Sequence, residues 1–427
     1  MNGKRNMRLH SLLFLLIVFV LLSLVHQLAA EILIPMDLSQ TDHLKAYGVA
    51  FYALIQQLNV KWLLNYRDGS FLIEDSKEIM SVCNIRGVSY QTVGTADLAS
   101  IYSTMNESNM EVINLEQEPK IAVYTPPNSL PWDDAVTLAL TYAEIKYDKI
   151  WDEEVLSGAL KDYDWLHLHH EDFTGQYGKF YGSYRTSDWY QEDVRVNEAM
   201  AKRNGFNKVW QLKHTIAEHI REYVVNGGFL FAMCAATETL DIALSAAGID
   251  IVEEQIDGDP LDPNYQSKLD FSRTFAFENY TLTPNPYKYE FSSIDTSEKR
   301  KLSNADQDFF ALFDFSAKFD PVPTMLTQCH TSIVNGFMGQ TTAFYKEFVK
   351  PAVIILGEAP GEDVVKYLHG NLGKGTFTFY GGHDPEDYAH RIGDPETNLS
   401  LHKNSPGYRL ILNNILFPAA EKKKLKT

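Results

Sequence analysis

The sequence predicts an α/β protein whose core is a doubly wound, mostly parallel sheet. Short apolar runs suited to buried strands alternate with longer segments that carry apolar residues at helical spacing. One such run, 229–233, leads directly into a helical segment, and another, 376–380, ends in two glycines. Because parallel strands present their carboxyl ends at one edge of a sheet, both runs are expected to deliver side chains to a common site.

Residues 1–30 have the features of a secretory signal peptide. A basic start that includes Lys4 and Arg8 precedes an apolar stretch over 12–24, and the small residues at 28–30 fit a cleavage signal. We expect the mature protein to be exported to the periplasm or the extracellular space, without stable membrane association after cleavage. The alternative is an uncleaved anchor, for which the apolar stretch is short.

An N-terminal α/β unit is expected at 31–117. Strand-like and helical segments alternate here, and this alternation predicts βαβ units with parallel strand pairing. The expected strands cover 31–35, 60–65, 70–73 and 88–93, and the expected helices cover 43–58, 76–86 and 95–105.

A second and larger array forms the expected core at 118–256 and 350–420, interrupted by an insertion at 257–349. Residues 171–208 are expected to form a loop. The insertion is expected to be rich in β structure and to include a strand at 322–326. The expected core strands are 120–124, 164–169, 229–233, 352–357 and a hairpin of 366–369 with 376–380, and the expected helices are 132–145, 210–225, 237–247 and 408–417.

The pattern around Cys234 is that of a nucleophile elbow. In an elbow, a strand turns sharply into a helix and lifts the nucleophile towards the helix N-terminus. The turn needs small residues two positions before and two positions after the nucleophile, and these are Ala232 and Ala236. We therefore predict Cys234 as a catalytic nucleophile. The alternative is a buried free cysteine that behaves as a small apolar residue.

His383 stands after a glycine pair and before two carboxylates. An imidazole beside a carboxylate is the usual arrangement for a general base. We predict His383 as the base that serves Cys234, with Glu386 or Asp384 orienting its ring. The alternative is that Asp384 caps a helix-initiating turn and that His383 is hydrogen-bonded locally.

A cluster of polar residues follows the strand at 164–169, and we predict that it binds substrate. Its members are His167, His169, His170 and Glu171. Such a cluster could also hold a metal through its imidazoles and a carboxylate. Because the HExxH spacing is missing, we expect a polar pocket lining and neither a metal nor a cofactor.

The composition and the motifs missing from the sequence disfavour several functional classes. The formal net charge is −18, from 38 basic and 56 acidic residues, which disfavours a nucleic-acid partner. Only three cysteines occur, which is too few for a disulfide framework in an exported protein. The sequence contains no P-loop, no GxGxxG after a strand and no GxSxG, so nucleotide-driven and serine-hydrolase chemistry lack their usual signals.

The segment 373–386 (GKGTFTFYGGHDPE) resembles the closing strand of trehalose-utilisation (ThuA-like) proteins and the His-Pro-Glu ending of class I glutamine amidotransferases. The Cys234 elbow is similar to the glutaminase nucleophile position of the latter. The resemblance covers about 119–250 and 350–418 and implies a flavodoxin-like sheet. The chain differs from the pattern at Ala235-Ala236, where a residue and then a glycine are expected, and at Asp384, which separates His383 from the Pro-Glu pair.

Over nearly its whole length the chain is also similar to an exported bacterial family that carries the name asparagine synthetase B. The segments that carry this likeness are 62–67 (WLLNYR), 166–172 (LHLHHED) and 312–318 (LFDFSAK). The name implies hydrolysis of a glutamine-type amide. We do not expect ATP-dependent synthesis, because no ATP-pyrophosphatase loop is found in the sequence.

Two functions from different classes follow. The first is hydrolysis of a small amide through Cys234. The second is a non-catalytic or carbohydrate-handling function of the ThuA-like kind, in which aromatic rings stack on a sugar. The aromatic residues expected near the cleft are Trp165, Tyr181, Trp189 and Tyr190. In both cases the expected partner is a small molecule.

Overall fold

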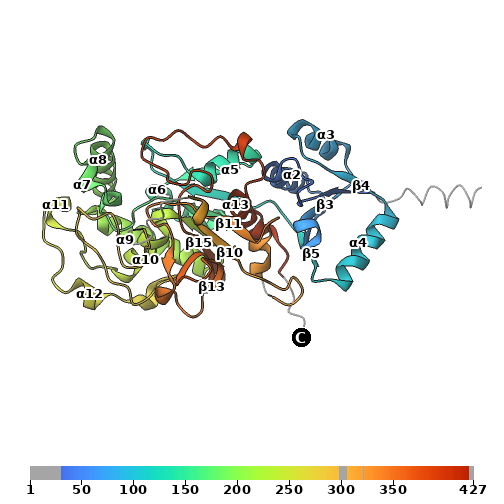
Figure 1. Ribbon diagram of the computed structural model, residues 1–427. Helices are drawn as coiled ribbons and strands as arrows, with labels where there is room; N and C mark the ends of the chain where they lie inside the picture. The colour runs from blue at the N-terminus through green and yellow to red at the C-terminus, as the bar shows by residue number, and fades with distance from the viewer. Residues whose placement is uncertain (1–29, 298–304, 321, 423–427) are drawn as a thin grey trace, which may run out of the picture.

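The computed structural model describes residues 30–297, 305–320 and 322–422, which form two β-sheets flanked by helices (Figure 1). One sheet has five strands and the other has ten. The expected signal peptide lies, except for residue 30, outside the described residues. Within the described part of the chain, no helix combines the length and apolar character needed to cross a membrane.

The five-stranded sheet is antiparallel throughout, which corrects the parallel pairing expected for 31–117. Its strand order is β4-β1-β3-β2-β5. A turn through Gly69, with φ of +90°, joins β2 and β3 into a hairpin, and β3 inserts between β1 and β2. Alternation along the chain does not reveal such an insertion. The elements are β1 (Glu31–Ile34), α2 (His43–Ile55), β2 (Val60–Leu64), β3 (Ser70–Glu74), α3 (Lys77–Arg86), β4 (Gln91–Val93), α4 (Thr95–Glu107) and β5 (Glu111–Leu115).

The ten-stranded sheet combines a parallel half and an antiparallel half. Strands β15, β9, β8, β6 and β7 are neighbours in that order and are parallel. Strands β14, β13, β10 and β11 extend the sheet from β15 with antiparallel pairing. The parallel strands are β6 (Ile121–Tyr124), β7 (Asp148–Ile150), β8 (Trp165–Leu168), β9 (Phe229–Met233) and β15 (Gly375–Tyr380). The antiparallel strands are β10 (Phe309–Leu312), β11 (Ile333–Asn335), β12 (Phe344–Tyr345), β13 (Ile354–Glu358) and β14 (Val364–Leu372).

Helices pack on the ten-stranded sheet in two groups. Helix α5 contacts α13 and also α2 of the N-terminal unit, whereas α9 contacts α6, α8 and α10. These contacts make an α/β core, as the sequence predicts. The helices are α5 (Ala135–Ala143), α6 (Asp152–Leu156), α7 (Tyr181–Tyr184), α8 (Asp188–Arg203), α9 (Val209–Val225), α10 (Cys234–Ser245), α11 (Glu254–Asp257), α12 (Tyr265–Lys268) and α13 (Pro406–Leu416).

Two segments differ from their sequence-based expectations. Residues 171–208 contain the long helix α8, whose many charged residues cover one face while Tyr190, Met200 and Ala201 are buried. The insertion at 257–349 is largely irregular in its described part: β10, β11 and β12 are short, and Val322–Thr327 forms a 3-10 helix where a strand was expected. The description of this insertion as β-rich is therefore too strong.

A buried arginine joins the N-terminal unit to the core. Arg409 of α13 is fully buried, and its guanidinium donates to the carbonyl oxygens of Met36 and Asp68 and to the Tyr47 hydroxyl. All three acceptors belong to the N-terminal unit. An acceptor that is buried without a donor costs free energy. The hydrogen bonds from Arg409 therefore favour the packing of the N-terminal unit against the core.

We expect Arg409→Met to lower the free energy of unfolding by about 3–5 kcal/mol, because it removes a buried charged donor from the carbonyl oxygens of Met36 and Asp68 and from the Tyr47 hydroxyl. Urea unfolding followed by circular dichroism measures the change. Arg391→Met, at an exposed position, is the control and should change the free energy by less than ~0.5 kcal/mol. Equal effects of the two substitutions would show that the Arg409 contacts do not join the units.

Candidate active site

Cys234 stands at a strained turn between β9 and α10. Its φ is +49°, in the left-handed region that non-glycine residues rarely occupy. Its side chain is almost completely buried, and no side chain caps the N-terminus of the helix that it begins. A helix N-terminus of this kind favours a thiolate through the helix dipole.

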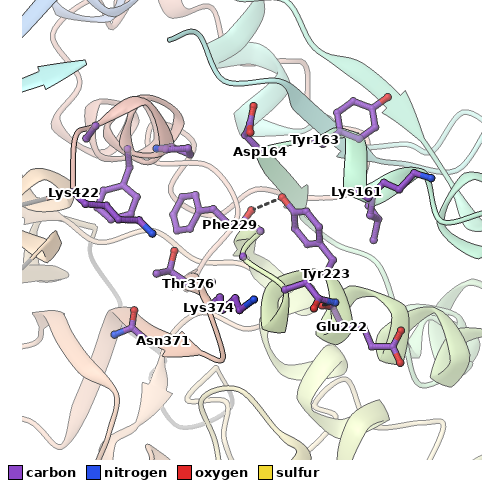
Figure 2. Close-up of a pocket in the computed structure, with 18 of the residues that line it drawn as sticks. Lys161, Tyr163, Asp164, Glu222, Tyr223, Phe229, Asn371, Lys374, Thr376 and Lys422 are labelled. Atoms are coloured by element: carbon purple, nitrogen blue, oxygen red, sulfur yellow. Dashed lines mark hydrogen bonds between the residues drawn. The ribbon is translucent and has the colours of Figure 1, made fainter. Parts of the chain in front are cut away.

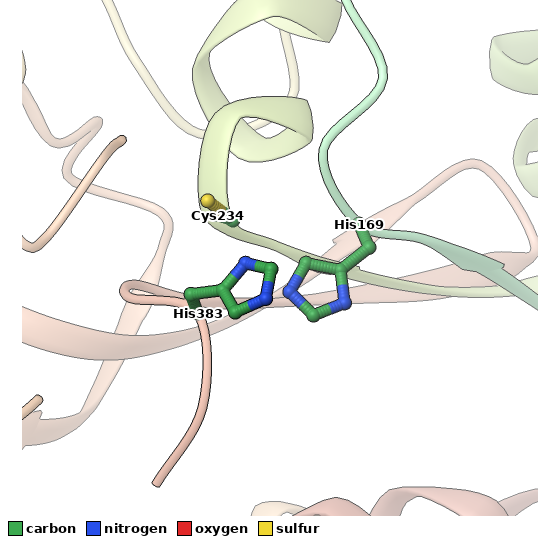
Figure 3. Close-up of side chains that lie close together, drawn as sticks. All are labelled: His169, Cys234 and His383. Carbon is green, nitrogen blue, oxygen red and sulfur yellow. The ribbon is translucent and has the colours of Figure 1, made fainter. Parts of the chain in front are cut away.

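The pairing of β9 with β15 brings His383 to Cys234. The strands are parallel, and Met233 at the end of β9 pairs with Tyr380 at the end of β15. Gly381 and Gly382 then turn the chain, so that a ring nitrogen of His383 lies within 4.8 Å of the Cys234 sulfur. Figure 3 shows the sulfur at the start of α10, with the His383 and His169 rings facing each other beneath it.

The carboxylate beside His383 is Asp133, and neither expected orienting residue lies there. Nε2 of His383 is 3.5 Å from Oδ1 of Asp133, whose side chain is 4% exposed. Glu386 instead pairs with Nδ1 of His402 at 2.8 Å. Asp384 accepts the backbone N–H of Glu386 at 2.8 Å. The prediction of Glu386 or Asp384 as the orienting residue is replaced, because the turn after His383 directs both carboxylates elsewhere.

Asp133 was not identified as a site residue from the sequence. Asp133 and Asp134 precede α5, where negative charge also suits the helix dipole. Asp134 does cap the helix, accepting the N–H groups of Val136 and Thr137. Asp133 is the preceding residue and faces the His383 ring instead. Asp133 lies in the loop after β6, whose carboxyl end is at the same sheet edge as Cys234, and that placement could have identified it.

The four predicted substrate-binding residues take different positions. His170 lines the same pocket as Cys234 and His383. His167 and His169 are fully buried, and the His169 ring centre lies 4.5 Å from that of His383. Glu171 accepts the backbone N–H of His169 at 2.7 Å. His170 is thus the member of the four with direct access to this pocket.

The pocket in front of Cys234 has a volume of about 570 Å³. Segments of the insertion form one side of it, and aromatic rings line it. The lining includes Trp132, His170, Phe180, Cys234, Tyr287, Tyr289, Gln340 and His383. Of the aromatic residues expected in this role, Trp189 packs behind Trp132, and Trp165 is buried in the sheet beside His167. Tyr181 contacts Tyr287, and Tyr190 is buried against Tyr177.

The electrostatics favour a charged pair between Cys234 and His383. Burial acts to raise the pKa of the Cys234 thiol, but the hydrogen bond and charge of His383, with the backbone N–H of Gln340, outweigh it and lower that pKa. Burial acts to lower the pKa of His383, but Asp133 and Cys234 raise it to about 10. The other two cysteines differ: burial raises the pKa of Cys83 to about 12 and also raises that of Cys329.

A larger pocket of about 820 Å³ lies at the other edge of the sheet (Figure 2). It is lined by residues at the starts of β9 and β15, among them Phe229 and Thr376. In Figure 2 the hydroxyl of Tyr223 donates to the carbonyl of Phe229, over 3.4 Å. Open α/β sheets place their chemistry at the carboxyl ends of strands. We therefore assign the chemistry to the Cys234 pocket.

No protein-family model matches the sequence, and no curated protein matches it either. A search of solved structures gives weak similarities. A cytoplasmic protein from Salmonella typhimurium has 11% identity and a TM-score of 0.36, covering 71% of this chain and 100% of its own. A second cytoplasmic protein, from Salmonella typhimurium LT2, has 12% identity and a TM-score of 0.33, covering 69% of this chain and 97% of its own. A GH42 β-galactosidase mutant from G. stearothermophilus has 12% identity and a TM-score of 0.25, covering 62% of this chain and 28% of its own.

We expect iodoacetamide to alkylate Cys234 at least ~10-fold faster than Cys83 or Cys329 in the folded protein at neutral pH, because only its pKa is lowered. The rate should fall only when the pH drops below this lowered pKa, since the thiolate is the reactive form. Peptide mass spectrometry measures the three rates. Both His383→Ala and Asp133→Asn should slow the alkylation of Cys234.

Glu386→Gln is the matched comparison for Asp133→Asn. Its carboxylate meets His402 and not His383, so the substitution should leave the alkylation rate close to that of the wild type. If Glu386→Gln slows the reaction as much as Asp133→Asn does, Glu386 is the orienting carboxylate after all. If iodoacetamide leaves Cys234 untouched in the folded protein, the thiol has a structural role.

Proposed function

We propose that the protein is an exported, cysteine-dependent hydrolase of a small glutamine-type amide, with a flavodoxin-like core of the class I amidotransferase kind. The observation that carries the proposal is the strained Cys234 beside His383 and Asp133 at one edge of the parallel strands.

The strand order supports the proposed flavodoxin-like fold. Numbered along the chain from β6, the parallel strands follow the order 2-1-3-4-5, which is the flavodoxin-like order.

In the proposed reaction, the Cys234 thiolate attacks the amide carbonyl. The N–H of Gln340, 3.3 Å from the sulfur, and the positive end of the α10 dipole stabilise the oxyanion. The His383 imidazolium gives its proton to the departing amine. The neutral imidazole then removes a proton from water, and the hydroxide cleaves the thioester to release the acid and restore the thiolate. Asp133 orients the ring and stabilises its charge.

The substrate proposal rests on pocket size and on the sequence likeness to the exported asparagine synthetase B family. A volume of about 570 Å³ suits a small molecule. Because this chemistry uses the thiol and the imidazole, it requires no nucleotide, and ATP-dependent synthesis is not part of the proposal. The excess of 56 acidic over 38 basic residues is consistent with a partner other than nucleic acid. Export rests on the signal-peptide pattern at 1–30.

A carbohydrate-handling function of the ThuA-like kind is the second candidate. The observation that favours it is the aromatic lining of the pocket by Trp132, Phe180, Tyr287 and Tyr289. Rings of this kind stack on the apolar faces of sugars. In this case Cys234 would have no chemical role, and a sugar would bind with or without the thiol.

We expect the mature protein to release ammonia from at least one member of a panel of small primary amides that includes glutamine. Cys234→Ala should lower kcat/KM by at least ~10³-fold, because it removes the nucleophile. A coupled ammonia assay measures the rates. Cys329→Ala is the matched control and should retain wild-type activity.

Two outcomes would contradict the hydrolase proposal. In the first, Cys234→Ala releases ammonia at the wild-type rate. In the second, no amide is turned over, while sugars quench the tryptophan fluorescence of the wild type and of Cys234→Ala equally. The second outcome favours the carbohydrate-handling function, since Trp132 lines the pocket.

A further inference from the structure

A second group of buried side chains lies next to the proposed catalytic residues. We call it the Asp134 cluster, and it consists of Asp134, His167 and His169. Nε2 of His167 lies 3.2 Å from Oδ2 of Asp134, and Nδ1 of His169 lies 3.3 Å from Oδ1. Both histidine side chains have 0% exposure. The thiol chemistry proposed above uses none of these atoms.

The inner nitrogens of the cluster are unsatisfied. Nε2 of His167 and Nδ1 of His169 have no hydrogen-bond partner among the described residues, although both are buried. Their contacts with Asp134 are at ion-pair distance, and each ring is charged only if it is protonated. Buried polar atoms are nearly always paired, and an exception often marks the place of an ion.

The second nitrogen of His167 fixes which of its atoms carries a proton. Nδ1 lies 3.1 Å from the carbonyl oxygen of Phe231, which can only accept a hydrogen bond, so Nδ1 carries the hydrogen. In the neutral ring, Nε2 then carries no hydrogen, and its lone pair faces a carboxylate oxygen of Asp134. Two lone pairs that face each other in a buried site repel, and a cation between them removes the repulsion.

We propose that Asp134, His167 and His169 bind a divalent transition-metal ion of the zinc type. Two imidazoles and one carboxylate form a ligand set that such ions use when a fourth position is left for water. Zinc bonds of about 2.0–2.1 Å in a tetrahedral site place neighbouring ligand atoms ~3.3 Å apart. The two imidazole nitrogens lie 3.2 and 3.3 Å from different oxygens of Asp134, and the three ligand atoms all lie within 4.8 Å of one another.

The outer contacts of His167 and Asp134 are also those of a metal site, whereas Nε2 of His169 has no hydrogen-bond partner among the described residues. A metal-binding histidine usually donates its other ring N–H to a carbonyl or carboxylate, as His167 does to Phe231. The carboxylate is held as well, because Oδ1 of Asp134 accepts the N–H groups of Val136 and Thr137. The ligands are therefore oriented by the ends of β8 and by the start of α5, before any ion binds.

The neighbouring cluster of Asp133, His383 and His390 fits an ion less well. Oδ1 of Asp133 lies 3.5 Å and 3.6 Å from the two imidazoles, which is longer than the zinc spacing. His383 is also the partner of Cys234. An ion in the Asp134 cluster would instead fix the His169 ring, whose centre lies 4.5 Å from that of His383. The metal thus supports one wall of the catalytic site without touching the thiol.

Metal analysis of the full-length mature protein tests the proposal. The protein is treated with a chelator, titrated with Zn²⁺, and analysed by elemental mass spectrometry. We expect one zinc ion per chain, and Co²⁺ in its place should give the visible absorption of a tetrahedral site. His167→Asn and His169→Asn should each weaken zinc binding by at least ~100-fold while circular dichroism stays that of the wild type.

Two buried histidines provide matched controls. His369, which bonds to Thr378 on the neighbouring strand, is outside the cluster, and His390 belongs to the Asp133 group. His369→Asn and His390→Asn should both keep one zinc ion per chain. Loss of zinc in His390→Asn, retention in the double variant of His167 and His169, or no stoichiometric binding by the wild type would each overturn the proposal. The wild-type titration decides the matter even if the histidine variants do not fold.

Discussion

The parallel pairing of β9 with β15 is the constraint on which the site depends. The two strands belong to segments about 150 residues apart in the sequence, and their register places Cys234 and the turn before His383 at the same edge. The close packing at this edge requires glycine. A Cβ atom at Gly339 would lie 2.7 Å from the backbone nitrogen of His383, and one at Gly381 would lie 2.7 Å from the carbonyl oxygen of Thr342. The insertion can therefore close over the thiol only because both positions lack side chains.

Two adjacent aspartates organise the buried charge at this edge. Asp133 faces His383 and His390, while Asp134 faces His167 and His169. Both precede α5, so the positive end of that helix offsets part of their charge. Burial alone would favour a protonated Asp133, yet the imidazoles of His383 and His390 lower its pKa. Asp133 therefore keeps its charge, and the His383 ring beside it gains a fixed orientation.

The local elements of this fold could be predicted from the sequence better than the pairing of distant strands could. The limits of β9 and the hairpin of β14 with β15 follow from glycines and apolar runs, whereas α10 begins at Cys234 and not at 237 as expected. The antiparallel N-terminal sheet did not follow, because β3 inserts between strands that alternation suggests are neighbours. Helix α8 was not predicted, because the many charged residues of its exposed face gave the segment the composition of a loop. Cys234 and His383 were identified from their strand-end positions. Asp133 was not identified, since its distance from His383 in the sequence gives no sign of contact.

The thiolate absorption of Cys234 in the ultraviolet tests the central claim most directly. The account predicts one thiolate per chain at neutral pH, lost when the pH falls below the lowered pKa of Cys234 and missing in Cys234→Ala. In His383→Ala the same absorption should develop only at or above the pKa of a free cysteine, about 8.5, because burial then raises the pKa of Cys234 without the opposing charge of His383. If the wild type shows no thiolate absorption until that pH, the charged pair of Cys234 with His383 does not exist and the proposed nucleophile is lost.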